Sequence, residues 1–208
     1  MTSTNTSGFS LVELVGTIAV SLVLVAIASL TMQPIWQQQH VTTAYNLTLT
    51  SLRRAHDQAA ADMRVYVVTF GPAVIGLNGG TIVATQTTTT GPVLFSISLP
   101  QDVTYHVEPG VPTSPTVIPT TPDGFGTAAA AFDFDWGGSG DTGGGNTIYF
   151  YPDGSAQDAN GNVNNGVVYM GMPGNLLSSR AVSLWGYTGR IRGWRLVKNG
   201  TAYSWSQQ

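Results

Sequence analysis

The sequence predicts an α+β protein, in which a long N-terminal helix precedes an antiparallel β-rich domain. Three observations predict it. Residues 14–30 are an apolar run without a charge, residues 41–63 carry apolar side chains at helical spacing, and short apolar runs separated by Gly, Pro, Asn and Asp follow Arg64. Of the 208 residues, the part beyond the helix has the size of a single domain.

Residues 9–33 are expected to form a hydrophobic transmembrane and assembly helix, because their apolar stretch is long enough to cross a bilayer. Glu13 lies at its start. A carboxylate at the centre of a bilayer costs about 2.5–3.5 kcal/mol unless it has a partner. Cleavage after Gly8 would give Phe9 a free amino group, which in a packed assembly could meet the Glu13 carboxylate of a neighbouring subunit. Residues 1–8 are then a leader peptide, and the mature chain is a subunit.

The stretch Gly8-Phe9-Ser10-Leu11-Val12-Glu13 resembles the processing signal of type IV pilins and type II secretion pseudopilins. The resemblance implies cleavage between Gly8 and Phe9 by prepilin peptidase, N-methylation of Phe9, and a role for Glu13 in assembly. It also implies a single-pass protein of the bacterial inner membrane, with its C-terminal domain in the periplasm. Other pilins or pseudopilins in a filament are the expected partners, and the choice between type IV pilus and type II secretion stays open.

Two other interpretations of this N-terminal helix remain. A secretory signal would use Ala26-Ile27-Ala28 as its small-x-small cleavage site. A simple membrane anchor would tether a periplasmic β-domain that never polymerises and acts as a binding module or an enzyme.

Residues 34–64 are predicted to form an amphipathic helix whose apolar face packs on the β-domain. Pro34 is expected to kink or locally melt the helix, because proline removes a backbone donor. The apolar side chains recur every three or four residues, as one face of a helix requires: Val41, Tyr45, Leu49, Leu52, Ala55, Ala59 and Met63.

Residues 65–208 are predicted to be the β-domain. Two irregular segments interrupt it, a Pro/Thr-rich surface loop at 109–122 and a Gly-rich flexible loop at 137–145. Strands are predicted, from β-branched and aromatic runs between turn signals, at 65–70, 81–85, 93–99, 103–107, 130–134, 147–151, 167–170, 181–185 and 190–197.

The order of helix and strands is similar to that of the GspH/FimT class of minor pilins and pseudopilins. The pieces that carry the resemblance are Leu52-Arg53-Arg54-Ala55, the run from Ile148 to Gly154, and Val182-Ser183-Leu184 with Thr188-Gly189-Arg190-Ile191-Arg192. The resemblance implies a type IV pilin-like fold and a GspH/FimT-like periplasmic domain.

The segment Gly189-Arg190-Ile191-Arg192 is the candidate binding site. Residues two apart in a strand share a face, so Arg190 and Arg192 are expected side by side, with Trp194 next to them. In the FimT branch such a motif is associated with DNA binding, so the resemblance implies double-stranded DNA as a partner, with Arg195 and Lys198 as helpers. Alternatively the arginines pair with the domain's own acids, since residues 65–179 hold eight acids and no Lys or Arg, whereas 180–208 hold five bases and no acid.

No enzyme and no cofactor are predicted. The sequence contains no phosphate-binding Gly-x-x-x-x-Gly-Lys loop, no His-Glu-x-x-His and no Gly-x-Ser-x-Gly. Zero cysteines exclude disulfides and thiolate-bound metals. Calcium is the one metal considered, either at Asp133, Asp135 and Asp141 or at the oxygen-rich segment Asp158–Asn162, with solvated turn acids as the alternative.

Overall fold

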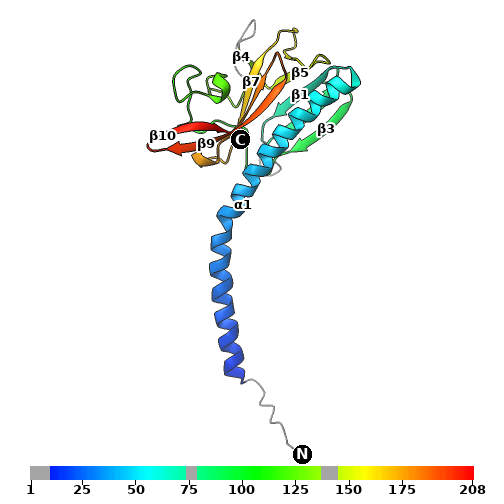
Figure 1. Cartoon of the computed structure of the whole chain (residues 1–208). Helices are drawn as coiled ribbons and strands as arrows, with labels where there is room; N and C mark the ends of the chain where they lie inside the picture. Colours follow the sequence, from blue (N-terminus) through cyan, green and yellow to red (C-terminus); the bar gives the residue numbers. More distant parts are fainter. Residues whose placement is uncertain (1–9, 74–78, 137–144) are drawn as a thin grey trace, which may run out of the picture. The chain divides into compact units, whose positions relative to one another are not determined.

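The computed structural model describes residues 10–73, 79–136 and 145–208. The chain forms two compact units, Met1–Gln38 and Gln39–Gln208. One α-helix, α1 (Leu11–Asp62), contributes residues to both units (Figure 1). The second unit is a β-rich domain of antiparallel strands, so the predicted α+β class is confirmed.

Helix α1 is continuous through Pro34. Of the two effects predicted there, a kink or local melting, the local melting is wrong. The helical assignment runs over all 52 residues without a break. A proline removes one N–H and crowds the carbonyl four residues earlier, but the turns on both sides keep their hydrogen bonds. In a helix of this length the loss of one hydrogen bond does not interrupt the secondary structure.

The part of α1 within the second unit buries the predicted apolar face. Val41, Tyr45, Leu52, Ala55 and Ala59 are buried as expected, and the face is wider than the apolar pattern alone, because it also takes in three neighbours, Ala44, Thr48 and Ser51. Leu49 is half-buried, and Met63 does not belong to the buried face, with 74% of its surface exposed. It follows the last helical residue and has a φ of 51°, so the helical period no longer applies to it.

The strands form two five-stranded antiparallel sheets. The first has the order β3-β2-β1-β5-β6, and the second has the order β10-β9-β8-β7-β4. The strand bounds are β1 Tyr66–Gly71, β2 Thr81–Gln86, β3 Val93–Ser98, β4 Phe132–Trp136, β5 Thr147–Phe150, β6 Ala156–Gln157, β7 Asn165–Met170, β8 Arg180–Trp185, β9 Arg190–Asn199 and β10 Ala202–Gln207.

Eight of the nine predicted strands are present, and residues 103–107 do not form one. In that segment Thr104 makes a single bridge to Gly171. Its hydroxyl is bonded to the His106 ring, 2.9 Å from Nδ1, and such local side-chain bonds compete with a ladder. The short β6 and the C-terminal β10 were not predicted. Tyr203 and Trp205 alternate after the Gly200 turn, and this pattern is a signal for β10.

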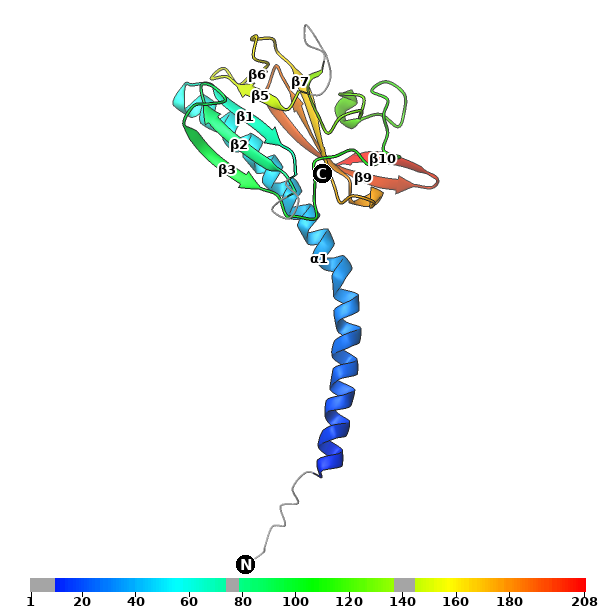
Figure 2. The ribbon, with the colours of Figure 1, turned by 180° about the vertical axis from the view of Figure 1, so that it is seen from behind.

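Two hydrophobic cores hold the β-domain together. Figure 2 shows β1, β2 and β3 lying against the part of α1 that belongs to this domain. The first core joins that part of α1 to both sheets, with Phe70, Phe134, Ile148 and Leu184 among its fully buried members. The second core lies on the other face of the second sheet and includes Val111, Phe125, Val167, Tyr169 and Leu196.

The Pro/Thr-rich segment is only partly a surface loop. Its middle is exposed, most of all at Ile118, but Val111 and Thr121 near its ends are buried. The chain then forms the 3₁₀ turn η1 (Pro122–Gly124) and buries Phe125 in the second core. The segment therefore covers one face of the second sheet. Nearly all of the Gly-rich loop, residues 137–144, lies outside the described residues.

Stability is expected to fall in acid, because several carboxylates accept hydrogen bonds in the folded state. Hydrogen bonds from the Ser155 hydroxyl and N–H hold the pKa of Asp153 below its usual range. Bonds from Gln58 and Tyr66 lower the pKa of Asp62 in the same way. A folded pKa below the unfolded one contributes stability at neutral pH that is lost as pH falls through the folded value.

Denaturant unfolding of the full chain in detergent micelles, repeated at decreasing pH, should therefore show a decline that begins below about pH 4. Asp153→Asn keeps an acceptor oxygen for Ser155 but has no proton to gain. The decline should be shallower in this variant, and an identical decline in both proteins would contradict the assignment to Asp153.

Candidate functional site

The first candidate is the apolar segment of α1 in the first unit. Leu11–Ser29 is 19 residues long with a mean hydropathy of 2.5, and none of it is buried within the chain. At 1.5 Å per residue it is about 28 Å long, close to the thickness of the hydrocarbon core of a bilayer. By length and composition the segment is compatible with a membrane anchor, and a signal sequence would satisfy the same criteria.

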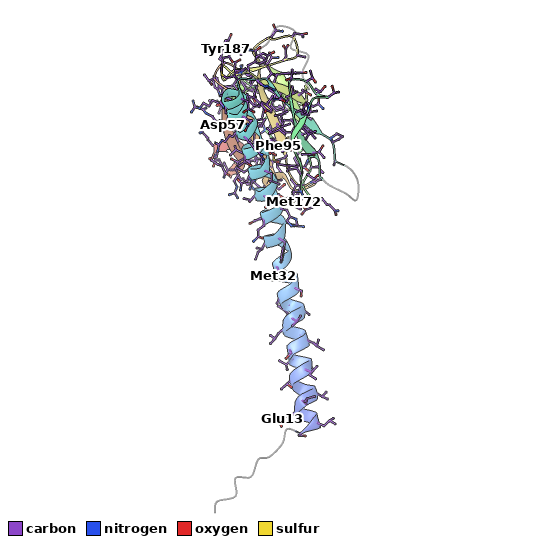
Figure 3. The ribbon with its side chains drawn as sticks, turned by 90° about the vertical axis from the view of Figure 1, so that its right-hand side faces the viewer. Glu13, Met32, Asp57, Phe95, Met172 and Tyr187 are labelled. Carbon is purple, nitrogen blue, oxygen red and sulfur yellow. The ribbon has the colours of Figure 1, made fainter. Side chains whose placement is uncertain are left out.

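Glu13 is the exception among the polar side chains of this segment. The three hydroxyls donate to carbonyls one turn earlier on the same helix: Thr17 to Leu14, Ser21 to Thr17 and Ser29 to Val25, at 2.8–2.9 Å. Glu13 lies exposed in the first turn (Figure 3) and has no bonding partner in the part of the chain that the structure describes. Gly8 and Phe9, the predicted processing residues, lie outside the described residues.

The second candidate is the β8–β9 hairpin, which carries the Gly-Arg-x-Arg segment. Gly189 has a φ of 59°, in the left-handed region that favours glycine. A Cβ there would lie 2.4 Å from the carbonyl oxygen of Gly154 and 2.4 Å from the His56 ring. Glycine is therefore required at position 189, because the Gly154 backbone and the His56 side chain leave no room for a Cβ. Arg190 follows directly after this turn.

Arg192 does not project freely, because it forms an ion pair with Asp123 of the Pro/Thr-rich segment. Its Nη1 donates to Oδ1 of Asp123, while the Ser183 hydroxyl donates to Oδ2 of the same carboxylate. Trp194 Nε1 in turn donates to Ser183 Oγ at 2.8 Å. The side chains of Arg192 and Asp123 are 21% and 4% exposed. This network anchors η1 to the second sheet. For Arg192 it agrees with the alternative in which the arginines pair with the domain's own acids.

The other three bases of the predicted site are exposed but do not form one patch. Arg190 shares a face of β9 with Arg192 and Lys198, whereas Arg195 points to the opposite face. Arg190 and Lys198 are eight residues apart on one strand, about 26 Å. None of the three exposed bases is paired with a carboxylate of the described residues.

Three of the eight acids in residues 65–179 have buried side chains and contribute little to the surface of the domain. Glu108, Asp123 and Asp133 are buried. Asp102 contacts His40, whose Nδ1 lies 2.8 Å from its Oδ2. Asp153 accepts hydrogen bonds within its own turn but is exposed and remains a surface charge. The sequence distribution of charge therefore overstates how acidic the surface is.

The residues considered for calcium do not converge in the described part of the chain. Asp133 lies buried in β4, while Asp141 and the side chain of Asp135 lie outside the described residues. Burial raises the pKa of Asp158, but hydrogen bonds from Asn162 and Asn160 outweigh it and lower the pKa overall. That carboxylate therefore already has donors. Among the described residues no group of three or more His, Asp or Glu side chains could hold a metal ion.

Sequence reasoning missed two contacts that fix the loops around this hairpin. Asp123 is separated from Arg192 by 69 positions, and nothing in the local pattern indicates the pairing. Glu108 lies two residues after His106, contacts its Nε2 at 2.7 Å and accepts from the N–H of Gly174 at 2.6 Å. The two-residue spacing of His106 and Glu108 is a signal for the first of these contacts only.

Comparison with known proteins adds no assignment to these sites, since no protein family, curated protein or solved structure matches the chain.

Proposed function

We propose that the protein is a minor pilin or pseudopilin, a membrane-anchored structural subunit of a type IV pilus or a type II secretion pseudopilus. Prepilin peptidase would cleave it between Gly8 and Phe9 and methylate Phe9. The subunit would wait in the bacterial inner membrane with its β-domain in the periplasm, and would then assemble with other pilins or pseudopilins into a filament. A type IV pilin-like fold belongs to this proposal.

The observation that carries the proposal is an exposed apolar helix with one unpartnered carboxylate, Glu13. The position of an acid in the first turn of a helix contributes about 0.3–1 kcal/mol through the helix dipole. Burial at the centre of a bilayer costs about 2.5–3.5 kcal/mol, and less near the interface. The dipole therefore does not offset deep burial of Glu13. A partner on another subunit, such as the free amine of Phe9, would.

Mass spectrometry of the protein purified from cells with an active prepilin peptidase tests this proposal. The expected mature N-terminus is N-methylated Phe9. An intact Met1 would favour a simple anchor for a non-polymerising binding module or enzyme, and a start at Ser29 would favour a secretory signal. Either of these two outcomes would overturn the filament proposal.

Contact with double-stranded DNA is a second candidate function. It is favoured by the exposure of Arg190, Arg195 and Lys198 without carboxylate partners in the described part of the chain. Guanidinium groups bind phosphates through paired N–H donors. Because Arg192 is held by Asp123, Arg190 is the residue of the Gly-Arg-x-Arg segment that remains for this contact. Retardation of duplex DNA by the full chain, weakened by Arg190→Ala, tests it.

A further inference from the structure

Two arginines lie directly opposite each other on β8 and β9. Arg180 is the register partner of Arg195. The N–H of Leu196 donates to the carbonyl of Ser179, so that pair is hydrogen-bonded and the next pair, Arg180 with Arg195, is a non-hydrogen-bonded one. In antiparallel sheets this is the closer type of pair, with Cα atoms about 4.5 Å apart. Like charges directly opposite each other are destabilising.

Burial makes this arrangement more costly. Arg180 is 8% exposed, and burial, with a smaller effect of the Arg195 charge, lowers its pKa to about 10. Its Nη1 donates to three carbonyl oxygens, those of Leu177, Ser178 and Ser179. No carboxylate in the described part of the chain is within ion-pair distance of Arg180 or Arg195. The pair thus lacks a counter-ion within the described residues.

A phenol group lies beside these arginines. Helix α1 passes next to β9 (Figure 1), and Tyr45 lies so close to Gly193 that a Cβ there would be 1.6 Å from its Oη. Gly193 is two residues from Arg195 and on the same face of β9. Burial raises the pKa of Tyr45, and the positive charges of Arg53 and Arg180 offset part of this effect. Its hydroxyl has no hydrogen-bond partner among the described residues. Two guanidinium groups and a phenol from three elements therefore lie close together without an anionic partner in the described part of the chain.

We propose that Tyr45, Arg180 and Arg195 form a binding site for an oxyanion of the phosphate class. Such a ligand supplies the missing negative charge and has several oxygens for guanidinium and hydroxyl donors. A free phosphate ion and a phosphodiester of a polyanion share this chemistry. The site lies on the face of β9 opposite Arg190 and Arg192, and it shares only Arg195 with the DNA contact considered above. It does not depend on filament assembly.

Thermal unfolding of the full chain in detergent micelles tests this site, with inorganic phosphate compared with chloride at equal ionic strength. A ligand that binds only the folded state raises the melting temperature. Phosphate should therefore raise it, and Arg195→Gln should abolish the increase. In chloride alone Arg195→Gln should melt higher than the unchanged protein, because the repulsion with Arg180 is removed. A loss of binding together with a gain in stability is the signature of a ligand site.

The chain offers a matched control for the arginine change and another for the tyrosine change. Arg54→Gln removes an arginine that lies over the Phe95 ring at 5.1 Å and should keep the phosphate effect. Tyr45→Phe removes one hydroxyl and should weaken the effect, whereas Tyr187→Phe, at a side chain 81% exposed, should not. An increase with duplex DNA but not with inorganic phosphate would support the phosphodiester source if Arg195→Gln abolishes it and Arg190→Ala, on the opposite face of β9, keeps it. No increase with either probe, or an equal increase in Arg195→Gln, would overturn the proposal.

Discussion

Replacing Glu13 with glutamine is expected to keep the protein out of filaments while leaving it in the membrane. Glutamine has nearly the same shape but no charge, so it cannot form an ion pair with the amine of Phe9 on a neighbouring subunit. At 4 Å and an effective dielectric of 20 such a pair is worth about 4 kcal/mol before desolvation. Incorporation should therefore fall by up to about a thousandfold. The measurement is the protein's content in sheared filaments relative to its content in membranes.

Thr17→Val is the matched control for this experiment. It also removes a polar group from the apolar segment, but the Thr17 hydroxyl is already bonded to the carbonyl of Leu14 at 2.9 Å and has no need of a partner outside the helix. Incorporation of this variant should match that of the unchanged protein. If Glu13→Gln assembled equally well, the carboxylate would have no role in packing and the filament proposal would lose the observation that carries it.

Local sequence patterns predicted most of the secondary structure, because helices and strands have fixed periods. The stripe from Val41 to Ala59 and eight strands follow directly from spacing. The errors occur where a local backbone conformation or a local side-chain hydrogen bond interrupts the regular helix or strand. Met63 adopts a positive φ after the last helical turn, and the bonds between Thr104 and His106 replace a strand.

The same difference between local sequence and whole fold decides which candidate sites could be predicted. Glu13 could be singled out from sequence, because its importance depends on its immediate neighbours. Arg192 could not be assigned, because its partner Asp123 lies on a segment whose path over the second sheet depends on the whole fold. The Arg180 and Arg195 pair was hidden for the same reason, since cross-strand register decides which side chains are neighbours.

Arg190 and Arg192 are expected to behave as opposites when each is replaced by alanine. Arg192→Ala leaves the Asp123 carboxylate, 4% exposed, without its counter-ion. Removing one partner of a buried ion pair typically costs 3–5 kcal/mol, and because the Arg192 side chain keeps some contact with water we expect about 3 kcal/mol of lost stability. Arg190→Ala removes an exposed side chain, so its effect on the free energy of unfolding should stay within about 0.5 kcal/mol.

Denaturant unfolding and DNA retardation, measured on the same two variants, separate the roles of the two arginines. If Arg190 contacts phosphates, Arg190→Ala should weaken the retardation of DNA. The slope of log affinity against log salt concentration should also become shallower by about one, because one phosphate contact is lost. The Arg192→Ala variant should be less stable. Under conditions in which it is folded, it should still retard DNA. A double replacement could not distinguish lost contact from lost structure, because the Arg192 change alone releases η1 from the sheet. If Arg192→Ala were as stable as Arg190→Ala, the ion pair with Asp123 would not hold η1, and Arg192 would again be available for a ligand.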